Sequence, residues 1–189
     1  LLNKYNALET EFQECRAWIK HQKKKFSIIE WLNENCKSPQ DYSTWLNNIS
    51  IGQKEVELIF THNFVMGMYY IFQKNLNLSD EQCFPIRAFN QKKNILFALE
   101  DDAWKMLDYN QVKNLIKPIH KKLQHEFKVW CDLHPKIVNN IYSNEFEENI
   151  QKINGIYKQT YDVALRKINI KLYEYLKFNL KSKVQYDFV

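Results

Sequence analysis

Apolar residues recur along the first part of the chain at alternating steps of four and three positions. The stripe consists of Leu1, Tyr5, Leu8, Phe12, Cys15, Ile19, Gln22, Phe26 and Ile29. An average step of about 3.5 residues is typical of a coiled-coil seam, which needs a partner helix. The pattern predicts a coiled-coil-like helix over residues 1–36, and a long helix folded back on its own domain is the alternative. A coiled coil would make the chain a homo-oligomer or the partner of another coiled-coil protein.

Helical periodicity also dominates residues 38–189, which we expect to form a mainly helical domain. Apolar side chains recur at three- and four-residue steps from Val56 to Leu76, from Val112 to Trp130, and from Tyr161 to about Lys181. Asn144, followed three residues later by Glu147, is a capping-box pattern. This pattern predicts a further helix that ends at Gly155.

Between these helices the pattern changes to short apolar runs. The runs 84–89 and 95–99 flank a polar segment, which predicts a β-hairpin near residues 84–99. An isolated hairpin is marginal in water, so it needs a third strand or a covering helix. Val184, Tyr186 and Phe188 alternate with polar neighbours and could supply that strand. The expected fold class is therefore α+β and predominantly α-helical, with a small inserted β-hairpin that could gain a third strand from the C-terminus.

The charge is mildly basic and carried by lysine. The chain has 27 lysines and arginines against 22 acidic residues, a net charge of +5, and only three of the cations are arginine. Because arginine is the main reader of guanine edges, this composition disfavours sequence-specific recognition of DNA.

The lysines could still bind the phosphates of a nucleic acid. Lys113, Lys117, Lys121 and Lys128 share a face of one predicted helix, and Lys92 and Lys93 lie at the hairpin turn. These lysines predict sequence-tolerant, salt-dependent binding of nucleic acid, with an ordinary solvated face as the alternative.

No catalytic constellation emerges from the sequence. His120, His125, Cys131 and His134 are zinc-ligand types in one short stretch, but residues five apart on a helix point about 140° from one another. The acidic run 100–102 is typical of a solvated turn, and three isolated glycines cannot form a phosphate-binding loop. We therefore expect no metal, no cofactor, no small-molecule substrate and no enzymatic activity.

The cysteines indicate the kind of cellular compartment in which the protein is found. Cys15, Cys36, Cys83 and Cys131 form no CxxC pair, and such well-spread thiols fit a reducing compartment. No stretch approaches the length and apolarity of a transmembrane helix, so no membrane association is expected. Because the chain begins at Leu1 rather than methionine, we expect it to be part of a longer protein.

The segment from Ile59 to Trp130 resembles a C-terminal helical domain found in uncharacterised proteins of giant nucleocytoplasmic large DNA viruses. The matching features are a helix over 63–76, the hairpin runs 84–87 and 94–97, Trp104 after the acidic run, and the lysine-rich helix 112–130. Family members often carry a coiled coil just before this domain. The family often has Cys or His where this chain has Ala88, so no metal role carries over. The resemblance implies a viral accessory or structural protein of the host cytoplasm, in the viral factory or the virion, and implies no reaction.

These observations favour a non-enzymatic interaction, scaffold or structural module that oligomerises through its N-terminal helix. The alternative is a nonspecific nucleic-acid-binding protein that uses the lysine-rich helix face.

Overall fold

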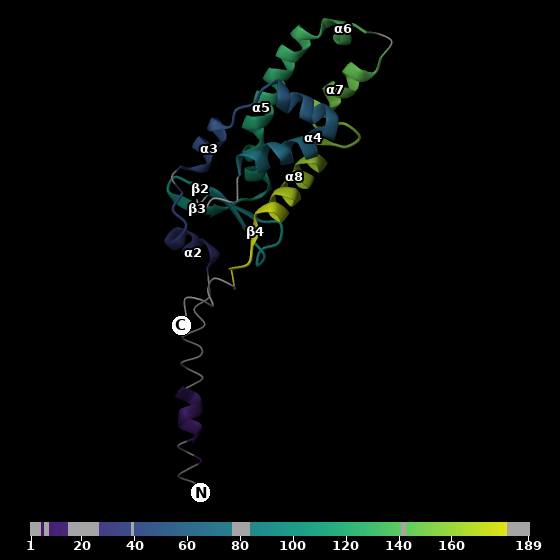
Figure 1. The fold of residues 1–189 in the computed structure, drawn as a ribbon. Coiled ribbons are helices and arrows are strands. Elements are labelled where there is room, and N and C mark those ends of the chain that lie inside the picture. The colour runs from purple at the N-terminus through teal and green to yellow at the C-terminus, as the bar shows by residue number, and fades with distance from the viewer. Residues whose placement is uncertain are drawn as a thin grey trace. The chain divides into compact units, whose positions relative to one another are not determined.

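The computed structural model describes residue 5 and residues 8–14, 27–38, 40–76, 84–140 and 143–180. The chain divides into two compact units, Leu1–Lys37 and Ser38–Val189 (Figure 1). The expected fold class is confirmed, because helices predominate and a small mixed sheet of four strands accompanies them.

In the first unit, the described part of residues 1–36 is not one continuous helix. Residues 8–14 are helical, and a separate helix, α2, spans Ile28–Asn35. Ser27 has an extended backbone, and its hydroxyl oxygen accepts a hydrogen bond from the Glu30 N–H at 3.3 Å. This is an N-cap, which begins a new helix. The expectation of one helix over 1–36 is therefore corrected at Ser27, and Ile29 lies on a different helix from Leu8.

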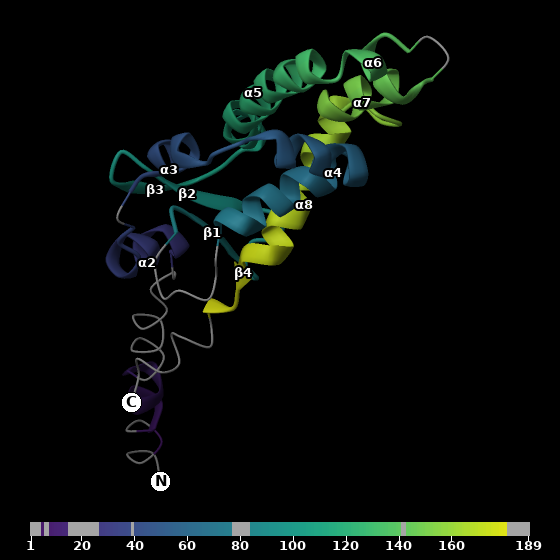
Figure 2. The ribbon, with the colours of Figure 1, turned by 45° about the horizontal axis from the view of Figure 1, so that its top comes forward.

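The second unit is built around packed helices. They are α3 (Tyr42–Asn48), α4 (Gln53–Asn75), α5 (Tyr109–Leu133), α6 (Pro135–Val138), α7 (Glu145–Ile153) and α8 (Tyr161–Leu176). Helices α4, α5 and α8 contact one another, while α6 and α7 lie at the end of this unit away from the sheet (Figures 1 and 2). The core between them is aliphatic and aromatic, with Val56, Phe72, Leu115, Ile119 and Leu172 almost fully buried.

Helix α4 is interrupted at Asn63, although its apolar periodicity predicts a single helix. Asn63 has a φ of 69°, and its side-chain oxygen accepts hydrogen bonds from the N–H groups of Val65 and Met66 at 3.0 and 3.3 Å. Asn63 thus caps the second half of the helix. The ammonium of Lys152 donates a hydrogen bond to the carbonyl of Phe60 at 2.9 Å. It thus provides a donor for a carbonyl at the end of the first half of α4.

The four strands are β1 (Ile86–Phe89), β2 (Leu96–Glu100), β3 (Ala103–Met106) and β4 (Lys177–Phe178), in the order β3-β2-β1-β4. The expected hairpin is present as the antiparallel pair β1–β2. The hairpin gains β3 on the side of β2, and on the side of β1 it gains β4 from the C-terminal part of the chain. Residues 184–188, the expected third strand, lie outside the described residues. Asp101 and Asp102, with φ of 51° and 59°, make the tight turn between β2 and β3. Two successive positive φ values are what a type I′ hairpin turn requires.

Two helix ends also differ from the expectation. Helix α8 stops at Leu176, because Lys177 is extended and starts β4, which pairs in parallel with β1. The expected capping box of α7 is absent, since the side chain of Asn144 makes no capping bond. The predicted end of α7 at Gly155 is present as a Schellman motif: the N–H groups of Ile156 and Gly155 donate to the carbonyls of Gln151 and Lys152 at 2.9 and 3.1 Å.

Candidate interaction surfaces

The N-terminal stripe is exposed wherever the structure describes it. Tyr5 and Leu8 are 67% and 70% exposed, and Phe12 on the same stripe is 59% exposed. Because steps of three and four residues return to the same side of a helix, these side chains form one apolar row. The other predicted members on the same segment, Leu1, Cys15, Ile19, Gln22 and Phe26, lie outside the described residues.

The predicted lysine row occupies the outside of α5. Lys113, Lys117, Lys121 and Lys128 are all exposed, and their spacing confines them to an arc of about 80°. Within the part of the chain that the structure describes, only Lys113 of these four has a carboxylate at ion-pair distance, Asp162 at 4.0 Å.

Lys92 and Lys93 are exposed in the turn between β1 and β2. Both this turn and the beginning of α5 contact helix α8. The side-chain amide of Asn169 donates to the carbonyl of Asn94 at 2.9 Å. Near the start of the same helix, Asp162 accepts a hydrogen bond from the Tyr109 hydroxyl at 2.9 Å and pairs with Lys113. Asp162 and Asn169 are seven positions apart on α8, so the turn and the beginning of α5 border one stretch of α8 that is about 10 Å long.

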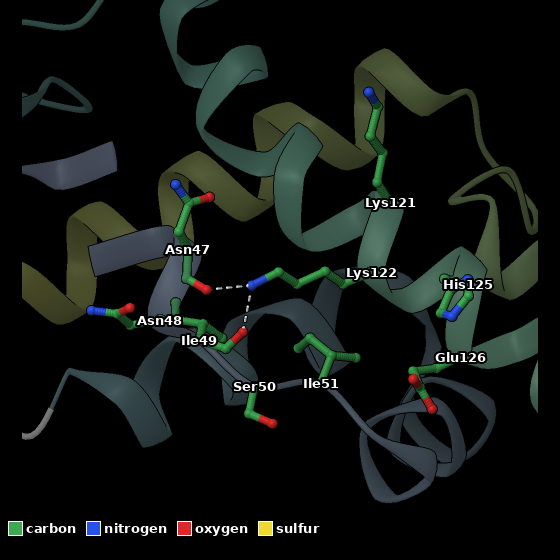
Figure 3. A pocket seen from close by; sticks show the side chains of 9 residues that line it. All are labelled: Asn47, Asn48, Ile49, Ser50, Ile51, Lys121, Lys122, His125 and Glu126. Carbon is green, nitrogen blue, oxygen red and sulfur yellow. Dashed lines mark hydrogen bonds between the residues drawn. The ribbon is translucent and has the colours of Figure 1, made fainter. Parts of the chain in front are cut away.

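Lys122 has a structural role that the lysine pattern does not reveal. Its ammonium donates to the carbonyls of Asn47 and Ile49 at 2.8 and 2.7 Å, and to that of Leu46 at 3.4 Å. These carbonyls close α3, where a positive charge stabilises the helix end. Figure 3 shows Lys122 reaching across to this segment, whereas Lys121 extends away from it.

An open pocket of about 540 Å³ lies beside Lys122. Its walls are residues 47–51 and the α5 side chains of Lys121, Lys122, His125 and Glu126 (Figure 3). Glu126 is held in place by Gln53, whose amide donates to both its carboxylate and its carbonyl at 3.1 Å. The pocket is therefore a shallow depression between α5 and the end of α3.

An exposed apolar row continues from this pocket along α5. His125, Val129 and Leu133 follow at four-residue steps, and Val129 and Leu133 are 37% and 64% exposed. This row begins about 40° beyond Lys121 around the helix and turns away from the lysines, so that Leu133 points about 140° from Lys128. The sequence analysis did not predict this exposed row, because most apolar residues of α5 lie on its buried side. A helical projection of Val129 and Leu133 against the lysines would have found it.

His120 is buried among aromatic rings where α5 meets α7 and α8. Its Nε2 lies 3.0 Å from the Ile153 carbonyl, and its Nδ1 lies 2.9 Å from the Tyr161 hydroxyl. Because a carbonyl only accepts, Nε2 carries the proton and Nδ1 of the neutral ring accepts from Tyr161. Burial lowers the pKa of His120, against the opposing effect of the Ile153 carbonyl.

The lowered pKa of His120 predicts a loss of stability in mild acid. The unfolded chain takes up a proton below about pH 6.5, whereas the folded chain does not until the pH reaches the lower folded-state pKa. The free energy of unfolding is therefore unaffected above about pH 6.5 and falls as the pH drops below it, by up to about 1.4 kcal/mol per pH unit. Urea unfolding across this range should show a shallower pH slope for His120→Gln than for the exposed control His125→Gln. Equal slopes in the two variants would contradict the assignment.

The other candidate ligands do not converge on His120. The Nδ1 of His134 donates to the Trp130 carbonyl at 2.8 Å, and His125 is exposed. Burial, together with Asp132, raises the pKa of the Cys131 thiol, which keeps it protonated at neutral pH. Among the described residues, no group of three or more His, Cys, Asp or Glu side chains is arranged to hold a metal ion.

The acidic run at the β2–β3 turn is paired internally. Lys105 binds the carboxylates of Glu100 and Asp101 at 3.2 and 3.4 Å. These acids are therefore engaged in a surface ion-pair cluster beside the turn.

No helix within the described ranges combines the length and the apolarity needed to cross a membrane. No protein-family model, curated protein or solved structure matches this chain. What the chain does must therefore be inferred from its own surfaces.

Proposed function

We propose that this chain is a non-enzymatic interaction or scaffold module that self-associates through the apolar stripe of its N-terminal helix. The observation that carries the proposal is the exposure of Tyr5 and Leu8 on one side of the helix, in line with Phe12. Burying a large apolar side chain contributes about 1.5–3 kcal/mol, so a partner helix on this stripe would be strongly favoured. The heptad spacing of the stripe supports a coiled coil as the mode of association.

The acidic side chains of this segment fit the same role. Glu9 and Glu11 are exposed on the two sides of the stripe, which leaves the apolar row bounded by charge. Such an arrangement is typical of a coiled-coil helix, in which charges flank the seam and restrict the choice and orientation of partners.

We further propose a biological setting from the resemblance of residues 59–130 to the viral domain. The module would belong to a structural or accessory protein of a giant DNA virus and act in the host cytoplasm, in the viral factory or the virion. The free thiol of Cys131 is compatible with a reducing compartment.

Self-association is tested by placing a charge in the stripe. Leu8→Asp should shift the chain to monomer, because an unpaired carboxylate in a helix–helix seam costs several kcal/mol. The matched control is Gln13→Asp, which adds the same charge at an exposed position off the stripe. Sedimentation velocity of both variants beside the unchanged chain measures the effect. A Leu8→Asp variant that associates as strongly as Gln13→Asp would refute the proposed seam.

Nucleic acid is the second candidate partner, and the exposed lysine row of α5 favours it. A polyphosphate chain held by Lys117, Lys121 and Lys128 would bind without sequence preference, and its affinity would fall steeply with salt. The turn lysines Lys92 and Lys93, which border the same helix α8, would extend this surface.

A further inference from the structure

A second pocket, of about 300 Å³, lies where the second half of α4 begins beside the chain that leads into α8. Its volume is at the lower end of the range for small-ligand pockets. The lining consists of Asn63, Val65 and Met66 from α4, residues 157–159 before α8, and Lys167 from α8.

The charge of this pocket is positive. Lys158 and Lys167 line it, and no acidic side chain is among the described residues of the lining. Neither ammonium has a carboxylate at ion-pair distance in the part of the chain that the structure describes. Each has a neutral partner instead: Lys167 donates to Oε1 of Gln159 at 2.8 Å, and Nζ of Lys158 lies 4.8 Å from the ring centroid of Tyr157. Because an ammonium has three N–H donors, both lysines keep donors for a ligand.

Glu148 is the acidic side chain beside this group, and it is engaged elsewhere. Its carboxylate accepts a hydrogen bond from the Tyr157 hydroxyl at 3.3 Å and pairs with Lys152 at 3.9 Å. It lies beyond ion-pair distance of Lys158 and Lys167, so it leaves their positive charge available to a ligand in the pocket.

The two amides of the pocket add further donors. The side-chain oxygen of Asn63 accepts hydrogen bonds from the N–H groups of Val65 and Met66, and that of Gln159 accepts from Lys167. Because these oxygens are engaged as acceptors, the NH₂ groups of Asn63 and Gln159 are the parts left for a ligand. A pocket that presents ammonium and amide donors selects a negatively charged ligand with several acceptor oxygens.

We propose that this pocket binds the phosphate group of a phosphate monoester. Such a group carries a charge of about −1.5 to −2 at pH 7 and three strong acceptor oxygens, which suits two ammoniums and two amides. A carboxylate, or a phosphodiester within a nucleic acid, brings only a single charge. Met66 is partly exposed in the same pocket and provides apolar area for the organic part of the ester. The inference goes beyond self-association and does not rest on it, because the pocket lies within the second unit.

Isothermal titration calorimetry with the full chain tests the pocket. The probes are methyl phosphate, a short peptide with one phosphoserine, and the same peptide without the phosphate. Lys158→Gln and Lys167→Gln should each weaken binding of the phosphorylated probes at least about tenfold, because each removes a charged hydrogen-bond donor. Lys54→Gln, which removes the same charge at an exposed position near the beginning of α4, is the matched control and should leave binding unchanged. Circular dichroism of each variant confirms that it is folded.

The two phosphorylated probes distinguish the sources of the phosphate. Tighter binding of the phosphopeptide assigns the pocket to a phosphorylated protein segment, whereas binding of methyl phosphate at least as tight assigns it to a small phosphate ester. The proposal is overturned if neither of them binds, if the unphosphorylated peptide binds as tightly as the phosphopeptide, or if both pocket variants bind like the unchanged chain.

Two further results would also overturn the proposal. If Lys54→Gln weakens binding as much as Lys158→Gln, the net charge of the chain and not the pocket is responsible. A single-stranded oligonucleotide without a terminal phosphate is titrated in parallel. If it binds more tightly than both phosphorylated probes and the pocket variants weaken it, the pocket belongs to a nucleic-acid surface.

Discussion

Gly155→Ala is expected to lower the free energy of unfolding by about 3 kcal/mol. Gly155 has a φ of +72°, which alanine adopts at a cost of about 1–2 kcal/mol. The added Cβ would also lie 2.7 Å from Cδ1 of Phe64 and 3.0 Å from Cδ2 of Tyr161. Phe64 is fully buried against His120 and Tyr161, so the rings cannot move away without disturbing the core.

Thermal unfolding at one protein concentration measures this effect. A change of about 3 kcal/mol should lower the Tm of a chain of this size by about 6–12 °C. Gly52→Ala is the matched control, because its φ is −141° and the added Cβ would lie 3.8 Å from the nearest atom, Oε2 of Glu55. The control should cost less than about 1 kcal/mol. If both variants lost a similar amount of stability, neither the positive φ nor the close packing at Gly155 would account for the destabilisation.

Lys122→Met should destabilise the fold by about 2 kcal/mol. Methionine keeps most of the apolar stem but removes the ammonium, which leaves the carbonyls of Asn47 and Ile49 without their charged donor. The end of α3 also loses a favourable charge at its negative dipole end.

Lys121→Met is the control for this change, since Lys121 is exposed and points away from the end of α3 (Figure 3). It should change the free energy of unfolding by no more than about 0.5 kcal/mol. Urea unfolding of the two variants gives the comparison. If Lys121→Met were as destabilising as Lys122→Met, general charge on α5 rather than the capping of α3 would be responsible.

Lys121 and Lys122 also show where sequence reasoning reaches its limit. Helical periodicity correctly placed Lys113, Lys117, Lys121 and Lys128 on one exposed face of α5. It could not show that Lys122 caps another helix, because that contact joins segments more than 70 residues apart.

The same limit applies to the break in α4 and to the missed strand. The apolar period passes through Asn63 without a gap, and the cation that completes the break, Lys152, comes from α7. Strand β3 was missed because the acids that precede it are typical of a solvated turn. Asp101 and Asp102 do form a turn, but it is the tight turn of a second hairpin. The helical content and the first hairpin could be predicted, since each depends on local periodicity.

The molar mass of the intact chain tests the central claim, self-association, most directly. Static light scattering over an about tenfold range of concentration should give a mass that rises above the 23.0 kDa of one chain toward a small multiple of it. The apolar stripe that contains Tyr5 and Leu8 predicts this result, because those side chains would be buried only in the assembled form. A mass of 23.0 kDa at every concentration would contradict the account.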